Sequence, residues 1–443
     1  MARTMPALRF STALYRFRES LFFLPLLVVV LGAVLAEVTA MIDGAFGSDR
    51  RIPLTVQMNS NAATWLLSTV AGAMITTAGV VFSLTVVSLQ LASSQFSPRV
   101  MRSFIRDRLS QSVIGLLVAT FVFSVLVLRH IDANEHTNAP RISMTLAIAL
   151  TLTTVVLIIA YLNRLAFGLQ VGEVVRTITD EAAAVLHHEA RHVREEIPAG
   201  EQATPTGRVL SVHAGSDGWV TQAPSRHILA AIPPATTVRL ETRTGAYIHR
   251  GEVLLSLWPA PEDAEAVERR VLSTVEIAAN RTMQHDVDFS IRQLVDIALR
   301  ALSPAINDPT TATEVVLRLG SLLRDILTTD QPPLEVQGPD GRVLLRPWNL
   351  SRNEYIEHAF DQIRQSVGGQ LHVATAVLRV LNMLIEHVTS EGHDESVPAL
   401  QAQQRMLMES LENRAEALGI HPQDLARLRA VYDDTDPAEH ELK

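Results

Sequence analysis

Four long apolar runs before residue 165 constrain this chain more than any other feature. They cover about Leu21–Ile42, Ala62–Ala92, Val113–Leu128 and Ile142–Leu162. A helix that crosses a bilayer needs about 20 mostly apolar residues, a length the third run reaches if its ends are extended. Charged residues make up only 19% of the chain, against about a quarter in soluble domains. We predict an α-helical integral membrane domain with four transmembrane helices over residues 20–167.

The arginines are divided unevenly among the segments that connect these runs. Four precede the first run and four lie between the second and third, whereas the other connections hold Arg50 and Arg51, then Arg141, with Arg129 at a helix edge. The positive-inside rule therefore predicts a cytoplasmic N-terminus over residues 1–19, a cytoplasmic loop over 97–110, and a cytoplasmic C-terminus. The first run could instead be a cleaved secretory signal, because Val34-Leu35-Ala36 suits a signal peptidase. Its continuation to Ile42 favours an anchor.

The second run carries a stripe of small and polar residues at heptad spacing. The helix predicted here is about 45 Å long at 1.5 Å per residue, which exceeds the ~30 Å hydrocarbon core. Positions at this spacing share one helix face, and small residues let membrane helices approach closely. The stripe predicts either a tight helix–helix seam or the wall of a hydrated pore. Its members are Thr69, Gly72, Thr76, Gly79, Ser83 and Gln90.

Charged residues beside the apolar runs suggest contacts with the membrane surface. Ser97 and Pro98 suit the start of a helix, and Arg99, Arg102 and Arg106 follow at i, i+3 and i+7. Such a helix would lie on the anionic inner surface, although these arginines could serve only to set topology. Glu37 is predicted to be interfacial, because it lies near the outer end of its helix.

The composition excludes several chemistries. The chain has no cysteine, so disulfides, thiol catalysis and Cys-ligated zinc are excluded. Its one lysine is Lys443, which removes a P-loop lysine and an internal biotinyl or lipoyl lysine. Residues 1–170 hold 13 Arg against 7 Asp and Glu, a net charge of +6. The remainder has a net charge of −15, which gives −9 for the whole chain. An acidic C-terminal region predicts no nucleic-acid partner.

The pattern His188-Glu189-Ala190-Arg191-His192 matches the H-E-x-x-H motif of zinc proteases. That chemistry needs a third ligand besides the two histidines. Glu195 and Pro198 stand where the extended motif has Gly and His, and neighbouring arginines would repel the metal. We therefore predict no zinc, no cofactor and no enzymatic activity, and keep a metalloprotease as a remote alternative.

The C-terminal part is predicted to be a cytoplasmic α+β region. Short β-rich segments punctuated by Gly and Pro indicate a small barrel or sandwich. Long amphipathic patterns then predict helices over Glu262–Gln284, Asn353–His387 and Val397–Leu418. The predicted divisions are a juxtamembrane helix and linker over 168–204, a β-rich module over 205–260, a mainly helical domain over 261–432 with a hairpin near 334–346, and a disordered tail over 433–443.

Two motifs resemble a family of bacterial membrane proteins. They are Gln95-Phe-Ser-Pro-Arg99 and the stretch from Asp288-Phe through Asp296-Ile-Ala-Leu-Arg-Ala-Leu-Ser-Pro-Ala-Ile-Asn-Asp-Pro-Thr-Thr-Ala312. Both are similar to the family called domain of unknown function 2254, over about residues 14–430. The resemblance implies N-terminal spans and a cytoplasmic domain, and transfers no catalytic residues. Ala305 stands where the family usually has Gly, which disfavours a left-handed backbone there.

The second motif joins two predicted helices through a proline-containing loop. Asp308 suits the N-cap and Pro309 the first turn of the second helix. Free N–H groups at a helix start favour anions. A rigid corner, a subunit interface and a ligand or anion site remain open, with Arg300, Ser303, Asn307 and Asp308 as the candidate residues.

These patterns together predict a multi-pass protein of the bacterial inner membrane. We expect an oligomeric channel-like or transport protein whose cytoplasmic domain forms a vestibule or gate. Its partners would be the lipid bilayer, further copies of itself, and an unidentified ion or small ligand. The alternative is a membrane-anchored scaffold or sensor that binds a protein or a small ligand.

Overall fold

The computed structural model describes residues 23–46, 55–95, 108–131, 139–168, 170–199 and 207–433. The chain divides into two compact units, residues 1–170 (unit 1) and 171–443 (unit 2). The predicted N-terminal segment, most of the 97–110 loop and the predicted disordered tail lie almost wholly outside the described residues.

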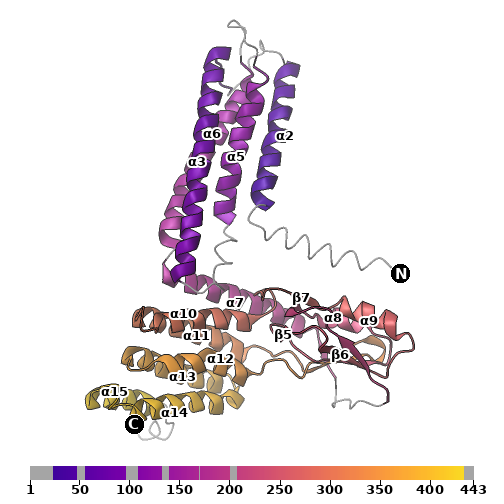
Figure 1. Ribbon diagram of the computed structural model, residues 1–443, viewed down its shortest axis with the longest axis vertical. Helices are drawn as coiled ribbons and strands as arrows, with labels where there is room; N and C mark the ends of the chain where they lie inside the picture. Colours follow the sequence, from indigo (N-terminus) through magenta and orange to yellow (C-terminus); the bar gives the residue numbers. More distant parts are fainter. Residues whose placement is uncertain are drawn as a thin grey trace. The chain divides into compact units, whose positions relative to one another are not determined.

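Unit 1 is a bundle of long helices arranged around α5 (Figure 1). Its described helices are α2 (Phe23–Phe46), α3 (Ser60–Gln95), α5 (Arg108–Leu128) and α6 (Arg141–Gly168). Helix α5 packs against the other three. Small residues make this packing close, because a Cβ built on Gly32 would lie 2.9 Å from the Cβ of Ala119, and one on Gly115 would lie 2.9 Å from the Cα of Pro25.

Hydrogen bonds between helices supplement this packing. The Thr85 hydroxyl and the Tyr161 phenol lie 2.6 Å apart, and the buried hydroxyls of Thr120 and Thr154 lie 3.2 Å apart. Asp43, near the end of α2, accepts hydrogen bonds from the backbone N–H groups of Ile142 and Ser143. It therefore satisfies donors at the start of α6 that would otherwise be unpaired.

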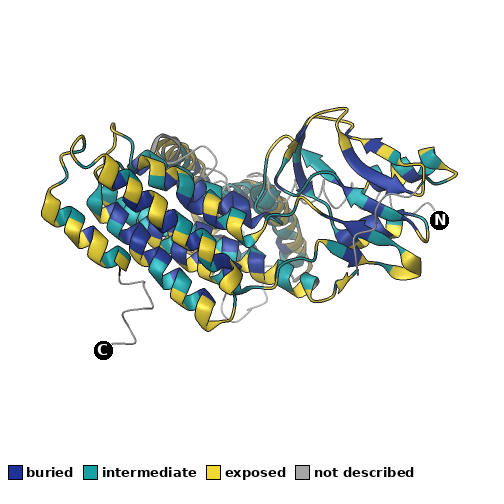
Figure 2. Ribbon diagram, turned by 90° about the horizontal axis from the view of Figure 1, so that it is seen from below, coloured by how far each residue is buried: buried dark blue, intermediate teal, exposed yellow. Residues whose placement is uncertain are grey.

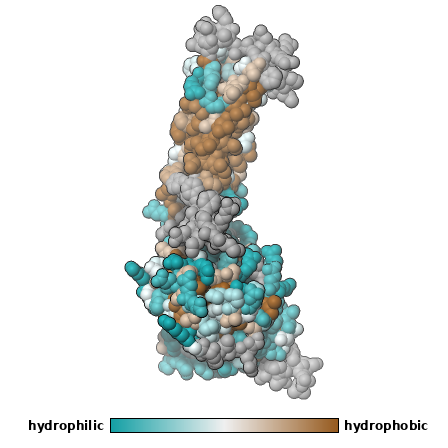
Figure 3. All heavy atoms as spheres, turned by 90° about the vertical axis from the view of Figure 1, so that its right-hand side faces the viewer, coloured by the Kyte–Doolittle hydropathy of each residue, from teal (hydrophilic) through white to brown (hydrophobic). Residues whose placement is uncertain are grey.

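Large apolar side chains cover much of the outside of unit 1. Figure 3 shows a continuous hydrophobic surface over its helices, whereas the visible surface of unit 2 is mainly hydrophilic. On α6 the exposed apolar residues include Leu152, Val155, Val156 and Ile159. A soluble protein rarely exposes such a large contiguous apolar surface.

Five described helices are long and apolar enough to span a membrane, one more than the sequence predicted. Four are the helices of unit 1. The fifth is α13 (Leu371–Ser390), which packs among the helices of unit 2. It is apolar because protein surrounds much of it, and a helix buried on several sides has the same composition as a span.

Unit 2 begins with α7 (Val171–Val193), which packs on a bundle of further helices. Figure 2 shows that the inner faces of this bundle are buried. The predicted helix 353–387 is wrong, because it divides at Gly368, whose positive φ suits a break between helices. Besides α13, the bundle contains α10 (Val287–Ala301), α11 (Pro309–Thr328), α12 (Arg352–Ser366), α14 (Val397–Asn413) and α15 (Pro422–Asp433).

Two sheets form the other part of unit 2. One has the strand order β1-β8-β9-β4-β6-β2 and the other β5-β3-β7. The strands are β1 (Ile197–Pro198), β2 (Leu210–His213), β3 (Gly218–Gln222), β4 (Thr237–Leu240), β5 (Tyr247–Ile248), β6 (Val253–Trp258), β7 (Glu276–Ala278), β8 (Glu335–Gln337) and β9 (Val343–Leu345). Helices α8 (Ser225–Ala231) and α9 (Ala264–Leu272) accompany them.

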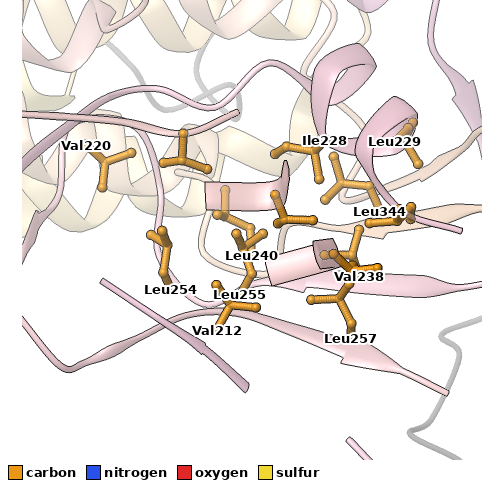
Figure 4. Close-up of a cluster of buried hydrophobic side chains, with 14 of the residues drawn as sticks. Val212, Val220, Ile228, Leu229, Val238, Leu240, Leu254, Leu255, Leu257 and Leu344 are labelled. Atoms are coloured by element: carbon orange, nitrogen blue, oxygen red, sulfur yellow. The ribbon is translucent and has the colours of Figure 1, made fainter. Parts of the chain in front are cut away.

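The β-rich part extends beyond the predicted module at 205–260. The hairpin near 334–346 forms as β8 and β9, but β9 pairs in parallel with β4, so it belongs with the sheets and not with the helical domain. Its buried Val336 and Leu344 complete the apolar core drawn in Figure 4. The predicted helix 262–284 is also wrong, because α9 ends at Leu272 and the chain continues as β7.

Candidate functional site

The stripe on α3 lies on the helix face opposite the one that packs in unit 1. Ala63, Leu67, Val70, Met74 and Val81 are buried on the packed face. All six stripe residues are exposed, namely Thr69, Gly72, Thr76, Gly79, Ser83 and Gln90. A Cβ built on Gly72 or Gly79 would meet nothing within 4 Å. The predicted seam is therefore not formed with another described helix of the same chain.

A hydrogen bond within α3 means that this stripe depends less on water as a hydrogen-bond partner. The Thr76 hydroxyl, which belongs to the stripe, donates to the carbonyl of Gly72 at 2.8 Å. Hydroxyls that bond to the preceding turn have satisfied their donor within the helix. The stripe is thus compatible with a dry protein contact as well as with a hydrated wall.

Two membrane-surface predictions have different outcomes. Arg99, Arg102 and Arg106 lie outside the described residues. Glu37 accepts a hydrogen bond from Arg129 at 2.8 Å, and one nitrogen of His130 lies 3.6 Å from the same carboxylate. The Glu37 carboxylate is therefore paired at the end of α5.

The predicted corner between α10 and α11 is built from capping bonds. Asp308 is the N-cap of α11 and accepts bonds from the backbone N–H of Thr311 at 3.1 Å and from its hydroxyl at 2.6 Å. Ser303 donates to the carbonyl of Arg300 at 2.7 Å. Asn307 has φ of 49° and accepts a bond from Gln370 at 2.7 Å. The left-handed residue is therefore Asn307, a type that tolerates this conformation.

The cap affects how an anion could bind at this corner. Hydrogen bonds from the Thr311 hydroxyl and N–H, which outweigh a small desolvation, lower the pKa of Asp308. The carboxylate therefore already occupies the position that an anion would take at the start of α11. These four residues lie together in the corner, and their contacts are those of a rigid turn.

A buried charged cluster, which the sequence patterns did not reveal, lies beside the start of α10. Arg281 donates to both oxygens of Asp286, at 2.5 and 2.9 Å, and to Asp288 at 2.7 Å. The second oxygen of Asp288 lies 2.6 Å from Nδ1 of His358 on α12. Asp286 also caps α10 by accepting a bond from the N–H of Phe289. We call these residues, Arg281, Asp286, Asp288 and His358, the seam cluster.

The seam cluster is electrostatically balanced by its own members. Burial alone would raise the pKa of Asp288, but hydrogen bonds from His358 and Arg281 and their positive charge hold it well below its usual range. Burial, with the charges of Asp286 and Asp288, raises the pKa of the nearby Tyr355 phenol. Asp288 therefore remains ionised and Tyr355 neutral near pH 7.

The seam cluster joins the sheets to the helical bundle. The Arg281 guanidinium lies 5.6 Å from the ring centre of Trp219 on β3 and 5.4 Å from that of Phe289 on α10. A Cβ on Gly245, in the turn before β5, would clash with Asp286 and Arg281, so only glycine permits this approach. Asp288 and His358 are 70 positions apart, which is why spacing along the sequence could not connect them.

The H-E-x-x-H segment has a structural contact of its own. Glu189 on α7 lies 2.7 Å from Nδ1 of His285, just before α10. Within the described ranges, no three His, Asp or Glu side chains are grouped so that they could hold a metal ion. The side chain of His192 is outside those ranges, and the absence of zinc stays a prediction.

Comparisons with known proteins agree with the apolar helices of unit 1. Residues 18–383 match the family described as "Predicted membrane protein (DUF2254)". The chain belongs to this family. Uncharacterized proteins of Mycobacterium bovis and of two Mycobacterium tuberculosis strains are 32% identical to it, over 82% of this chain and 71% of their own length. No solved structure matches the chain.

Membership in DUF2254 confirms the resemblance that the two motifs indicated. It identifies a membrane protein family whose members named here are uncharacterised. The seam cluster and the corner both contain residues of the longer motif, Asp288 in the former and Ser303, Asn307 and Asp308 in the latter. The motif therefore contributes to two features. One is the connection between the sheets and the bundle, and the other is the turn from α10 to α11.

Proposed function

We propose that this DUF2254 protein is an oligomeric, channel-like protein of the bacterial inner membrane. Helices α2, α3, α5 and α6 are its four spans, and both termini are cytoplasmic. Unit 2 is the cytoplasmic vestibule or gate, and α13 belongs to its core. The distribution of arginines supports this topology, and unit 2 packs most of its large apolar side chains inside.

The exposed stripe on α3 carries the proposal. It runs along the face of α3 that no described helix of the chain covers, and bulky apolar residues flank it. These flanking residues, including Ile75, Val80, Phe82 and Leu84, are exposed and suit lipid. The glycines and small hydroxyl residues between them allow close approach of another backbone. We therefore place α3 of a second copy, or water at the centre of an assembly, against the stripe.

Two further features support transport. Helix α3 has 36 residues, about 54 Å at 1.5 Å per residue, so it extends beyond a core of ~30 Å. Residues 171–443 carry the whole acidic excess, a net charge of −15, and such a region attracts cations to the mouth of a conduit. A cation is therefore the ion class that we assign to the proposed conduit.

The second candidate function is a membrane-anchored scaffold or sensor. The bond from Thr76 to Gly72 favours it, because this hydroxyl needs no water or ion as a partner. In that case the stripe is a dry contact between copies, and unit 2 binds a protein or small ligand. Neither candidate includes an enzymatic step or a bound zinc ion.

Cysteine labelling separates the two functions without background, because the chain has no cysteine. Thr76→Cys and Ser83→Cys lie on the stripe, Val80→Cys is the lipid-facing control, and Ala78→Cys is the buried control. A pore predicts reaction of the two stripe cysteines with water-soluble thiol reagents and altered currents in bilayers. A dry contact predicts unreactive stripe cysteines that cross-link between copies. Labelling of the stripe only by lipid-phase reagents would contradict both functions.

The assembly itself is tested by enlarging the stripe. Gly79→Leu should prevent close backbone approach and lower the oligomer fraction measured by mass photometry in nanodiscs. Gly44→Leu is the matched control, since a Cβ at Gly44 also meets nothing within 4 Å but lies on α2. A parent that is monomeric would overturn the proposal, and an oligomer unchanged by Gly79→Leu would exclude α3 of a second copy as the partner of the stripe.

A further inference from the structure

Helix α7 and the strand after it form one segment, residues 171–199, that contacts both parts of unit 2. In the sequence it directly follows α6, which is a candidate span. Figure 1 shows α7 along the bundle, with the sheets beyond its far end. The segment begins on the helices and ends as β1 in the six-stranded sheet.

The first half of the segment is fixed to the bundle. Val175, Ile178 and Ala182 are buried, and α7 packs against α10 and α11. At its start, a Cβ on Gly172 would lie 2.8 Å from a carboxylate oxygen of Glu314 on α11. Close packing and buried apolar residues hold this half of α7 in place.

The second half of the segment is fixed to the sheets by a buried arginine. Arg346, directly after β9, donates to both oxygens of Glu196 at 3.3 and 2.6 Å. It also donates to the Ser225 hydroxyl at 2.8 Å and the Pro333 carbonyl at 2.7 Å. Strand β1, which begins at the next residue after Glu196, pairs with β8. A fork of donors shared among three segments fixes their relative positions.

A third contact of the segment lies between its attachment to the bundle and its attachment to the sheets. Glu189 on α7 contacts His285, and the seam cluster holds the same stretch, residues 281–288, to α12. This stretch joins β7 to α10, so it is one of the covalent connections between sheets and bundle. The segment 171–199 is thus attached to the bundle, to the sheets and to one of the connections between them.

We infer that residues 171–199 lock the bundle and the sheets of unit 2 into one body, with Glu196 and Arg346 as the locking pair on the sheet side. Movement of the chain at the end of α6 is then passed to both parts together. The direction of transmission rests on the proposed span α6, whereas the lock itself depends only on contacts within unit 2. Within unit 2, the sheets and the bundle then move as one body.

Distance measurements in the full-length chain in nanodiscs test the lock. Spin labels at Ser321→Cys on α11 and Arg250→Cys before β6 are both at exposed positions, and dilution with unlabelled protein removes distances between copies. Double electron–electron resonance should give one narrow distance peak in the parent. In Arg346→Met that peak should be lost or broadened. Arg194→Gln is the control on the same segment, because it breaks an exposed ion pair between Arg194 and Asp330. In this variant the distance peak should be unchanged.

The outcomes decide the inference in every case. Circular dichroism and melting identify a variant that fails to fold, and Glu196→Gln, which keeps the side-chain shape, then replaces Arg346→Met. A broad peak in the parent, or a narrow peak in the folded variants, would overturn the lock. Because these distances lie within one chain, they do not depend on whether the stripe on α3 forms a pore, a dry contact or neither.

Discussion

Helices α6 and α13 have similar compositions but opposite surroundings. Both are long and apolar enough to span a membrane. On α6, Leu152 and Ile159 are 62% and 64% exposed, whereas on α13 Leu381 and Leu384 are fully buried among other helices of unit 2. The apolar surface of α6 therefore needs lipid, while that of α13 is satisfied by protein.

This contrast shows that apolar content along one helix does not identify its solvent. Whether a helix faces lipid or protein is indicated by the charges that flank it and by the helices that pack against it. In unit 1 many large apolar residues face outward on α2, α3 and α6, while apolar and small residues together make the internal contacts. In unit 2 most large apolar residues face inward. The following predictions test this difference, beginning with the largest effect.

Topology should separate α6 from α13 completely. Reporter fusions after Thr55, Ile105, Thr137 and Val175 should read outside, inside, outside and inside. A fifth fusion after Gly392, beyond α13, should read inside like the fusion after Val175. If the fusions after Val175 and Gly392 report opposite sides, α13 spans the membrane and the contrast is wrong.

The same substitution should have unequal effects in the two helices. Leu384→Ala on α13 removes a fully buried side chain and should cost about 2–5 kcal/mol of unfolding free energy. Leu152→Ala on α6 removes an exposed one and should change stability by no more than about 0.5 kcal/mol. Urea or thermal unfolding in detergent, followed by circular dichroism of the helices of both units, measures both. Equal losses would contradict the assignment of α6 to lipid.

Acid should weaken unit 2 through the seam cluster. The pKa of Asp288 is lower in the folded protein than its ordinary value, so its contribution is present above pH ~4 and is lost as the pH falls below that value. Asp288→Asn should cost about 3 kcal/mol at pH 7, as expected for one partner removed from a buried ion pair. The difference from the parent should shrink in acid. Asp424→Asn, in an exposed pair with Arg427, is the control, and a pH-independent difference for Asp288→Asn would contradict the pairing.

The smallest effect should come from the corner between α10 and α11. Asp308→Ala removes the N-cap of α11 and should cost about 1 kcal/mol. Pro304→Ala, at an exposed position of the same loop, is the control. Thermal melting of the full chain compares the two. A much larger loss on Asp308→Ala, with an unchanged Pro304→Ala, would indicate a role for Asp308 beyond capping.

Much of unit 1 could be predicted from the sequence, because each of its long helices is marked by a run of apolar residues. The apolar runs correspond to α2, α3, α5 and α6 within a few residues. The cap at Asp308 was also predictable, since Asp-Pro at a helix start acts through its nearest neighbours. Helices 262–284 and 353–387 were predicted too long, because their amphipathic patterns continue across the strand β7 and across the break at Gly368.

What the sequence alone determined is local: the apolar runs, the charge asymmetry, the stripe on α3 and the family. The tertiary structure decided what each of these faces. It showed the stripe exposed, α13 enclosed, the 334–346 hairpin joined to β4, and Arg281, Asp288 and His358 in one cluster. Periodicity specifies which residues share a face, but the partner of that face comes from segments far away in the chain, and sequence spacing carries no information about it.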